Sequence, residues 1–269
     1  MPNFLKQYEA ELLPLLTIQD PNLETMASVA RRLESLQSVF RAVPGCVGFI
    51  PFCEAYRLIA QGMASIPKKN AYHKLAELNR LNVIFISYYF RALQQFIQTG
   101  TAPLPWKTYF TYCQRPHGAP FLQMILGVNA HINGDLPHAL AVAGYADTHD
   151  YHLMNQLLEG QVPAVLWFLA FIAGDRVAFG GVVFRRFARE EFHAIVTTWR
   201  LEAWLSARAL ETKTLAPARL TTATEEVGQR LVAILGDGSS FRHIRSDLKE
   251  IHALKQLIEE ARVGKDLPR

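Results

Sequence analysis

Apolar positions along most of the chain recur at the three- and four-residue spacing of an amphipathic helix. Two long stretches, 71–98 and 189–211, have broad apolar faces and are expected to form long central helices. The alternation typical of strands does not recur, and the sequence has no glycine-rich phosphate loop. The pattern predicts an all-α protein, a single compact multi-helix domain over 1–269 with its core in 70–210.

Turn-forming and capping residues set the expected limits of the other helices. Asp20-Pro21 is predicted to start a helix that runs to Ala42, because aspartate caps a helix and proline fits its first turn. Gly160 is predicted to end a helix capped by Asp147 or Thr148. Residues 177–184 are expected to be helical or irregular. The remaining helices are expected at 3–16, 54–64, 106–112, 163–173, 221–236 and 239–263, the last of them amphipathic.

The segment 121–139 begins as an apolar helical run and then places several polar side chains close together. His131 and Asp135 are four residues apart, as are Asn129 and Asn133, so each pair lies on one helical face. Pro137 disfavours a continuous helix here. We therefore expect a stop at a left-handed Gly134, with Asp135 as the N-cap of a second helix. The sequence predicts that His131, Asp135 and Asn129 share one poorly solvated pocket at this corner.

Composition narrows the class of protein. The chain has 269 residues, 50% of them hydrophobic and 19% charged, with a net charge of +4. The basic residues are scattered, which argues against a nucleic-acid partner. Three cysteines, Cys46, Cys53 and Cys113, lack the close pairing of a zinc site or a disulfide framework. The N-terminus shows no signal peptide, and the longest apolar run, 162–173, is too short to span a membrane. A cytoplasmic location and a small-molecule substrate are expected, with the oligomeric state left open.

The polar corner carries residue types that bind metals or move protons. His131 and Asp135 can supply two ligands to a divalent metal, with zinc the best match, and His149 and His152, or Asp150, can add others from the next helix. Asn129 and Asn133 would orient those ligands or take part in catalysis. The expected activity is that of a metal-dependent hydrolase, possibly of phosphoesters, in which the metal lowers the pKa of bound water. A structural role remains open, because an aspartate can simply cap a helix and a histidine can bond a buried carbonyl.

Two resemblances bear on this corner. Residues 131–138 are loosely similar to the H-x-x-G-D motif of zinc-dependent phospholipase C and the zinc-dependent single-strand nucleases, which are all-helical. Those families continue with His-Gln-Pro, where this chain has Pro137-His138-Ala139. The run Asn-Ala-His-Ile-Asn-Gly-Asp-Leu at 129–136, with Asp150-Tyr151 and Asn155, closely resembles domain-of-unknown-function family 5995. That likeness covers about residues 70–210 and implies that these polar positions are the family's signature, but implies no activity.

Two other functions are consistent with the sequence. The first is a metal-free enzyme or binding protein whose apolar pocket accepts a lipid- or polyketide-like molecule, with the polar cluster as its few polar contacts. The aromatic residues that could form its wall are Tyr88, Tyr89, Phe90, Trp106, Tyr109, Phe121, Trp167 and Trp204. The second is a structural module whose C-terminal helix, within 239–263, docks on a partner.

Overall fold

The computed structural model describes residues 4–66, 72–172 and 182–235, and every regular element within these ranges is a helix. The predicted all-α class is therefore confirmed. The α-helices are α1 (Glu9–Leu16), α2 (Met26–Ala42), α3 (Ile50–Ala64), α4 (Leu75–Thr99), α5 (Trp106–Cys113), α6 (Pro120–Asn129), α7 (Leu136–Ala143), α8 (Thr148–Ile172), α9 (Val182–Glu211) and α10 (Pro217–Leu235). Short 3₁₀ turns occupy Lys6–Tyr8 and Val47–Phe49, and a π-helical segment occupies Ala130–Asp135.

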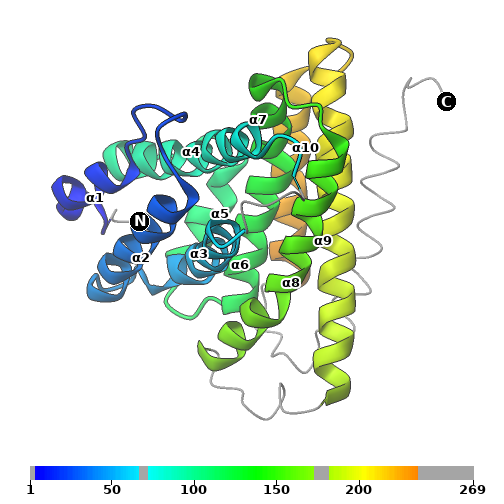
Figure 1. Cartoon of the computed structure of the whole chain (residues 1–269). Coiled ribbons are helices and arrows are strands. Elements are labelled where there is room, and N and C mark those ends of the chain that lie inside the picture. The colour runs from blue at the N-terminus through cyan, green and yellow to red at the C-terminus, as the bar shows by residue number, and fades with distance from the viewer. Residues whose placement is uncertain (1–3, 67–71, 173–181, 236–269) are drawn as a thin grey trace.

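The helices pack around the segment that joins α6 to α7. The long helices α8 and α9 run side by side, and α1 and α2 lie at the opposite edge of the molecule from α9 (Figure 1). The π-helical segment contacts α4, α9 and α10, and all six of its residues are buried. In the part of the chain that the structure describes, no helix is long and apolar enough to cross a membrane.

The π-helical segment solves a steric problem that Pro137 creates. In a regular α-helix the proline ring would clash with the carbonyl of Asn133, four residues earlier, and its missing N–H would leave that carbonyl unbonded. Here the N–H of Leu136 donates to the carbonyl of His131, five residues earlier, which widens the turn by one residue. The chain therefore passes from α6 into α7 with no break, and its four polar side chains stay in the core.

The prediction of a left-handed stop at Gly134 is wrong. Among the described residues the glycines with positive φ are Gly45, Gly100 and Gly144, and Gly134 lies inside the π-helical segment. Asp135 does not cap α7 with its side chain. Gly134 is required for a different reason, since a Cβ at this position would lie 2.3 Å from Cγ of Pro105. The missing side chain thus allows the loop that precedes α5 to approach the segment closely.

Other predicted boundaries also change. The Oδ1 atom of Asp20 accepts the N–H of Asn22, which closes a turn, and α2 begins only at Met26, with Thr25 as its N-cap. Gly160 does not end its helix, because α8 continues from Thr148 to Ile172 and buries further apolar side chains beyond it. Burial of that face outweighs the roughly 1 kcal/mol cost of an interior glycine. The predicted 239–263 helix lies outside the described residues.

We expect Gly134→Ala to destabilise the fold by roughly 1–3 kcal/mol, the usual cost of forcing extra volume into a packed core. The matched control is Gly160→Ala, also within a helix, where an added Cβ meets nothing within 4 Å. That control is expected to raise stability by roughly 0.5–1 kcal/mol, since alanine is the better helix former. Chemical denaturation measures both changes. Equal effects of the two substitutions would contradict the close contact with Pro105.

Candidate active site

The two polar residues singled out from the sequence, His131 and Asp135, form a buried pair. The residues His131 and Asp135 are 2% and 5% exposed, and Nδ1 of His131 lies 3.0 Å from Oδ2 of Asp135. The same carboxylate oxygen accepts the indole N–H of Trp106 at 3.0 Å. Trp106 is the first residue of α5, so the close approach at Gly134 is what brings this donor to the carboxylate. The Asp135 carboxylate is therefore bonded by one residue of the π-helical segment, His131, and by one residue of α5, Trp106.

The imidazole ring of His131 is fixed by aromatic neighbours. It stacks on Phe85 of α4, with ring centroids 3.6 Å apart and an interplanar angle of 5°. Phe52 and Tyr56 of α3 meet it edge-on, with centroids at 5.7 and 4.9 Å. A ring packed in this way cannot rotate without displacing three other rings. The Asp135 bond and this packing together determine the direction in which each ring nitrogen points.

The second polar pair ties the segment to α10. Nδ2 of Asn133 donates to Oδ1 of Asn129 at 3.0 Å, and Nδ2 of Asn129 donates to the carbonyl of Thr224 at 3.0 Å. Both asparagines are buried. The structure thus places the predicted catalytic residues Asn129 and Asn133 in a network that anchors the π-helical segment. Among the described residues, neither asparagine hydrogen-bonds to His131 or Asp135, which form a separate pair.

Burial determines the charge of the pair. Removal from water lowers the pKa of the His131 imidazole well below its usual value, and the positive charge of Arg200 lowers it further. Burial also raises the pKa of Asp135, while the Trp106 hydrogen bond and the charge of Arg91 act in the opposite direction. The imidazole is therefore uncharged at neutral pH. An uncharged imidazole keeps one nitrogen as a hydrogen-bond acceptor.

A mostly apolar cavity of about 70 Å³ lies beside His131. Nδ1 of His131 is hydrogen-bonded to Asp135. The other ring nitrogen, Nε2, is buried and has no hydrogen-bond partner among the described residues. Three methionines in the wall, Met63, Met124 and Met154, are side chains that adapt readily to a ligand. The polar side chains in the wall are Tyr56, Asn82, His131, Gln161 and Arg200.

A second cavity, of about 230 Å³, reaches the pair from its other side. Asp135 and Trp106 line it, together with Arg91 and His138. Partial burial lowers the pKa of His138. The predicted pocket shared by His131, Asp135 and Asn129 does not form: His131 lines the first cavity, Asp135 lines the second, and Asn129 lines neither. Of the eight aromatic residues predicted as a pocket wall, Tyr88 and Trp106 line the second cavity, and none lines the first.

The other predicted metal ligands lie elsewhere. His152 is exposed on α8, where its Nε2 lies 3.1 Å from the side-chain amide nitrogen of Gln156. His149, in the first turn of α8, stacks against His73 with ring centroids 4.3 Å apart. Among the described residues, the group of three or more candidate ligands that comes together is His73, His149 and Asp150, and it does not include His131 or Asp135. The structure therefore does not assemble the ligand set His131, Asp135, His149 and His152.

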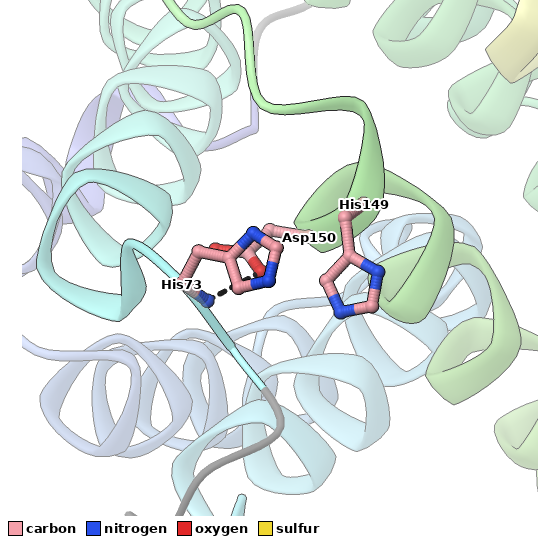
Figure 2. Close-up of side chains that lie close together, drawn as sticks. All are labelled: His73, His149 and Asp150. Carbon is pink, nitrogen blue, oxygen red and sulfur yellow. Dashed lines mark hydrogen bonds between the residues drawn. The ribbon is translucent and has the colours of Figure 1, made fainter.

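The His73–His149–Asp150 cluster lies between the chain entering α4 and the first turn of α8 (Figure 2). One ligand atom from each residue lies within 4.8 Å of the others. The buried carboxylate of Asp150 accepts the backbone N–H groups of His73 and Lys74 at 2.8 and 2.7 Å, which holds it in place. A carboxylate oxygen with one such bond keeps a lone pair for a metal ion.

Sequence reasoning did not find four residues that shape the main site, namely Arg200, Tyr56, Phe85 as the stacking partner of His131, and Trp106 as the donor to Asp135. Arg200 left a readable signal, since it lies in α9 next to the buried positions Ile195, Trp199 and Ala203. A charged residue at the edge of such an apolar stripe is either paired or functional. The other three come from helices far away in the sequence and left no local signal.

The low pKa of His131 predicts a dependence of stability on pH. We compare His131→Phe with its parent in an Asp135→Asn background, so that only the imidazole of the pair titrates. Below about pH 6.5 the unfolded imidazole takes up a proton and the buried one does not. The parent is therefore expected to lose stability relative to the Phe variant between pH 7 and 5, by up to about 1.4 kcal/mol per pH unit.

Denaturant unfolding at several pH values measures this difference, and His152→Asn, at an exposed position of α8, is the control. A free-energy difference that stays constant from pH 7 to 5 would show that folding leaves the pKa of His131 unchanged.

Comparison with known proteins identifies the family. No curated protein and no solved structure gives a significant match to this chain. Residues 26–236 match a family described as "Family of unknown function (DUF5995)", a range that covers α2 to α10 with both polar pairs, the two cavities and the His73 cluster. The run 129–136 lies within the matched residues. The chain is a member of the DUF5995 family.

Proposed function

We propose that this protein binds a small, largely apolar molecule in the cavity beside His131, and that His131 acts on it as a general base oriented by Asp135. The observation that carries the proposal is the unbonded Nε2 atom of His131, a residue that lines an apolar cavity. A buried polar atom left without a partner costs roughly 1–3 kcal/mol. A ligand that offers a hydrogen or a proton to Nε2 would remove this cost.

The arrangement of the pair supports base chemistry. Burial raises the pKa of Asp135, whereas the Trp106 hydrogen bond and the charge of Arg91 favour its carboxylate form. In that form the Nδ1–H of His131 donates to Oδ2 and Nε2 carries a lone pair. The same carboxylate stabilises the imidazolium that forms when Nε2 takes a proton, which is the role of the aspartate in a catalytic triad. The lowered pKa means that the base is already deprotonated at neutral pH. The described residues in the cavity wall include no serine, threonine or cysteine, so the geometry favours direct proton transfer over a covalent route.

The cavity limits the size of the molecule. Its volume of about 70 Å³ is roughly half that of an engineered protein cavity that holds benzene. A short-chain compound, or one end of a longer molecule, fits this space. The three methionines of the wall can move to admit more.

Exchange of the α-hydrogens of nitroethane for solvent deuterium, followed by proton NMR, tests the proposal. Nitroethane is small, and a base removes its carbon-bound proton while the electron pair moves onto the nitro group. We expect the protein to accelerate this exchange, and His131→Phe to reduce the acceleration about a hundredfold, a typical contribution of a general base. As the pH falls from 8 to 6, the rate should decline less than it would with a histidine of ordinary pKa, because burial lowers the pKa of His131.

The control for the nitroethane experiment is His152→Ala, which removes an exposed histidine of α8 and is expected to leave the exchange unchanged. Acceleration that survives His131→Phe, or that is lost with His152, would contradict a base at His131. The absence of any acceleration above buffer would do the same.

A second candidate function is a metal-dependent hydrolase with its metal at the His73–His149–Asp150 cluster. The specific observation is the convergence of two imidazoles and a carboxylate within 4.8 Å. The Asp147 carboxylate lies 3.4 Å from Nδ1 of His73 and can join the set. Two histidines and a carboxylate with an open position match catalytic zinc sites. The two rings are now stacked with an interplanar angle of 15°, and both are exposed enough to turn toward a common ion.

Metal analysis after zinc loading and desalting separates the two metal hypotheses. If the cluster holds the metal, we expect near-stoichiometric zinc in the wild type, loss of zinc in His73→Ala and in His149→Ala, and retention in His131→Phe. Loss in His131→Phe with retention in His73→Ala would favour the ligand set predicted from sequence. Zinc-free wild-type protein would contradict both.

A further inference from the structure

The side chain of Arg200 is a buried positive charge without a paired carboxylate. Arg200 is 5% exposed, and no carboxylate within the described ranges forms an ion pair with it. Its Nε–H donates to Oδ1 of Asn155, and its guanidinium lies over the ring of Tyr151 at 5.0 Å. Three other partly buried arginines each have a carboxylate partner: Arg32 with Glu24, Arg57 with Glu54, and Arg208 with Glu211.

The guanidinium is held in one orientation. Asn155 and Tyr151 are one turn apart on α8, and both contact Arg200 of α9. The hydroxyl of Tyr151 also donates to the backbone carbonyl of Arg200 at 2.8 Å, which fixes the backbone beneath the side chain. Asn155 takes Nε of Arg200, and the two terminal amino groups have no described hydrogen-bond partner. They are not among the fully buried polar atoms, so a ligand can reach them. Such a prepositioned fork suits the two oxygens of a carboxylate.

Arg200 lines the same cavity as His131 and Tyr56. The rest of that wall is mostly aliphatic, aromatic or methionine side chains. A guanidinium that is mostly buried in such surroundings loses part of its hydration, and an anionic ligand would compensate for that loss. The cavity therefore offers an apolar space with a fixed cation and a neutral hydrogen-bond acceptor in its wall.

We propose that the natural ligand carries an acidic group, a carboxylate, that binds the free N–H groups of Arg200, and a short apolar chain that fills the cavity beside His131. This inference rests on the proposed function for the cavity and names the class of its ligand. The carboxylate supplies the counter-charge that the described chain does not. The apolar chain of the ligand fills the part of the cavity that the three methionines line.

Binding of an anion at Arg200 also changes the base. The positive charge of Arg200 is one of the causes that lower the pKa of His131. A carboxylate paired with Arg200 offsets that charge, so the bound ligand makes His131 a stronger base than it is in the empty protein. The site thus gains basicity when its ligand is in place.

Calorimetric titration with butyrate and with butanol tests the inference, because the two share an apolar chain and differ in charge. We expect butyrate to bind the full-length protein at least tenfold more tightly than butanol. Arg200→Met should remove this preference, and Arg200→Lys should retain part of it as a charge without the fork. Arg208→Met is the matched control, on the same helix but outside the cavity wall, and should keep the full preference.

Equal affinity for butyrate and butanol in the wild type would overturn the inference, whether or not the Arg200 variants fold. A preference that persists in folded Arg200→Met would overturn it as well. Neither result depends on the nitroethane exchange, which reports on His131. A failure of the ligand class is therefore distinguishable from a failure of the base.

Discussion

The architecture around α6 and α7 depends on the need to satisfy a carboxylate in the core. Asp135 is 5% exposed, and its Oδ2 atom is reached by two nitrogen atoms from different directions, Nδ1 of His131 and Nε1 of Trp106. Without these contacts the buried group would be strongly destabilising. The indole can reach it because Gly134 lets Pro105 and the start of α5 come close. The imidazole can reach it because the π-helical segment keeps positions 131 and 135 on one face.

The same constraint leaves the imidazole with a free nitrogen. Nδ1 is used by Asp135, the ring faces are covered by aromatic side chains, and Nε2 remains without a described partner beside a cavity. Arg200 adds a fixed positive charge to the wall of that cavity. An oriented base, an anchored cation and an apolar space are the elements from which we infer a small-molecule site.

Much of the fold could be predicted from the sequence, because helical periodicity depends on residues that are close in the chain. The all-α class follows from apolar positions that recur every three or four residues. The pairing of His131 with Asp135 follows from their separation of four residues. The passage through Gly134 could not be predicted in the same way. A proline at 137 permits either a broken helix or a widened turn, and the outcome depends on Trp106 and Thr224, which lie far away in the sequence. The positions of Arg200 and Tyr56 in the cavity wall depend likewise on how α3 and α9 pack.

The metal hypothesis shows the same limit. Spacing alone suggested that His149 and His152 would join His131, since they follow it closely in the chain. In the structure His149 lies beside His73 at the start of α4, and His152 points along α8 to Gln156. Two imidazoles and a carboxylate do converge, but at a junction of helix ends separate from the buried pair. The described chain thus separates its candidate base from its candidate metal ligands.

The central claim is that His131 is a neutral base whose Nδ1 proton is held by Asp135. Nitrogen-15 NMR of the imidazole measures this directly in the full-length protein, with His131→Phe used to assign the signals. We expect a protonated Nδ1 and an unprotonated Nε2 from pH 7 to 8. An imidazolium over this range, or a neutral ring protonated at Nε2, would contradict it.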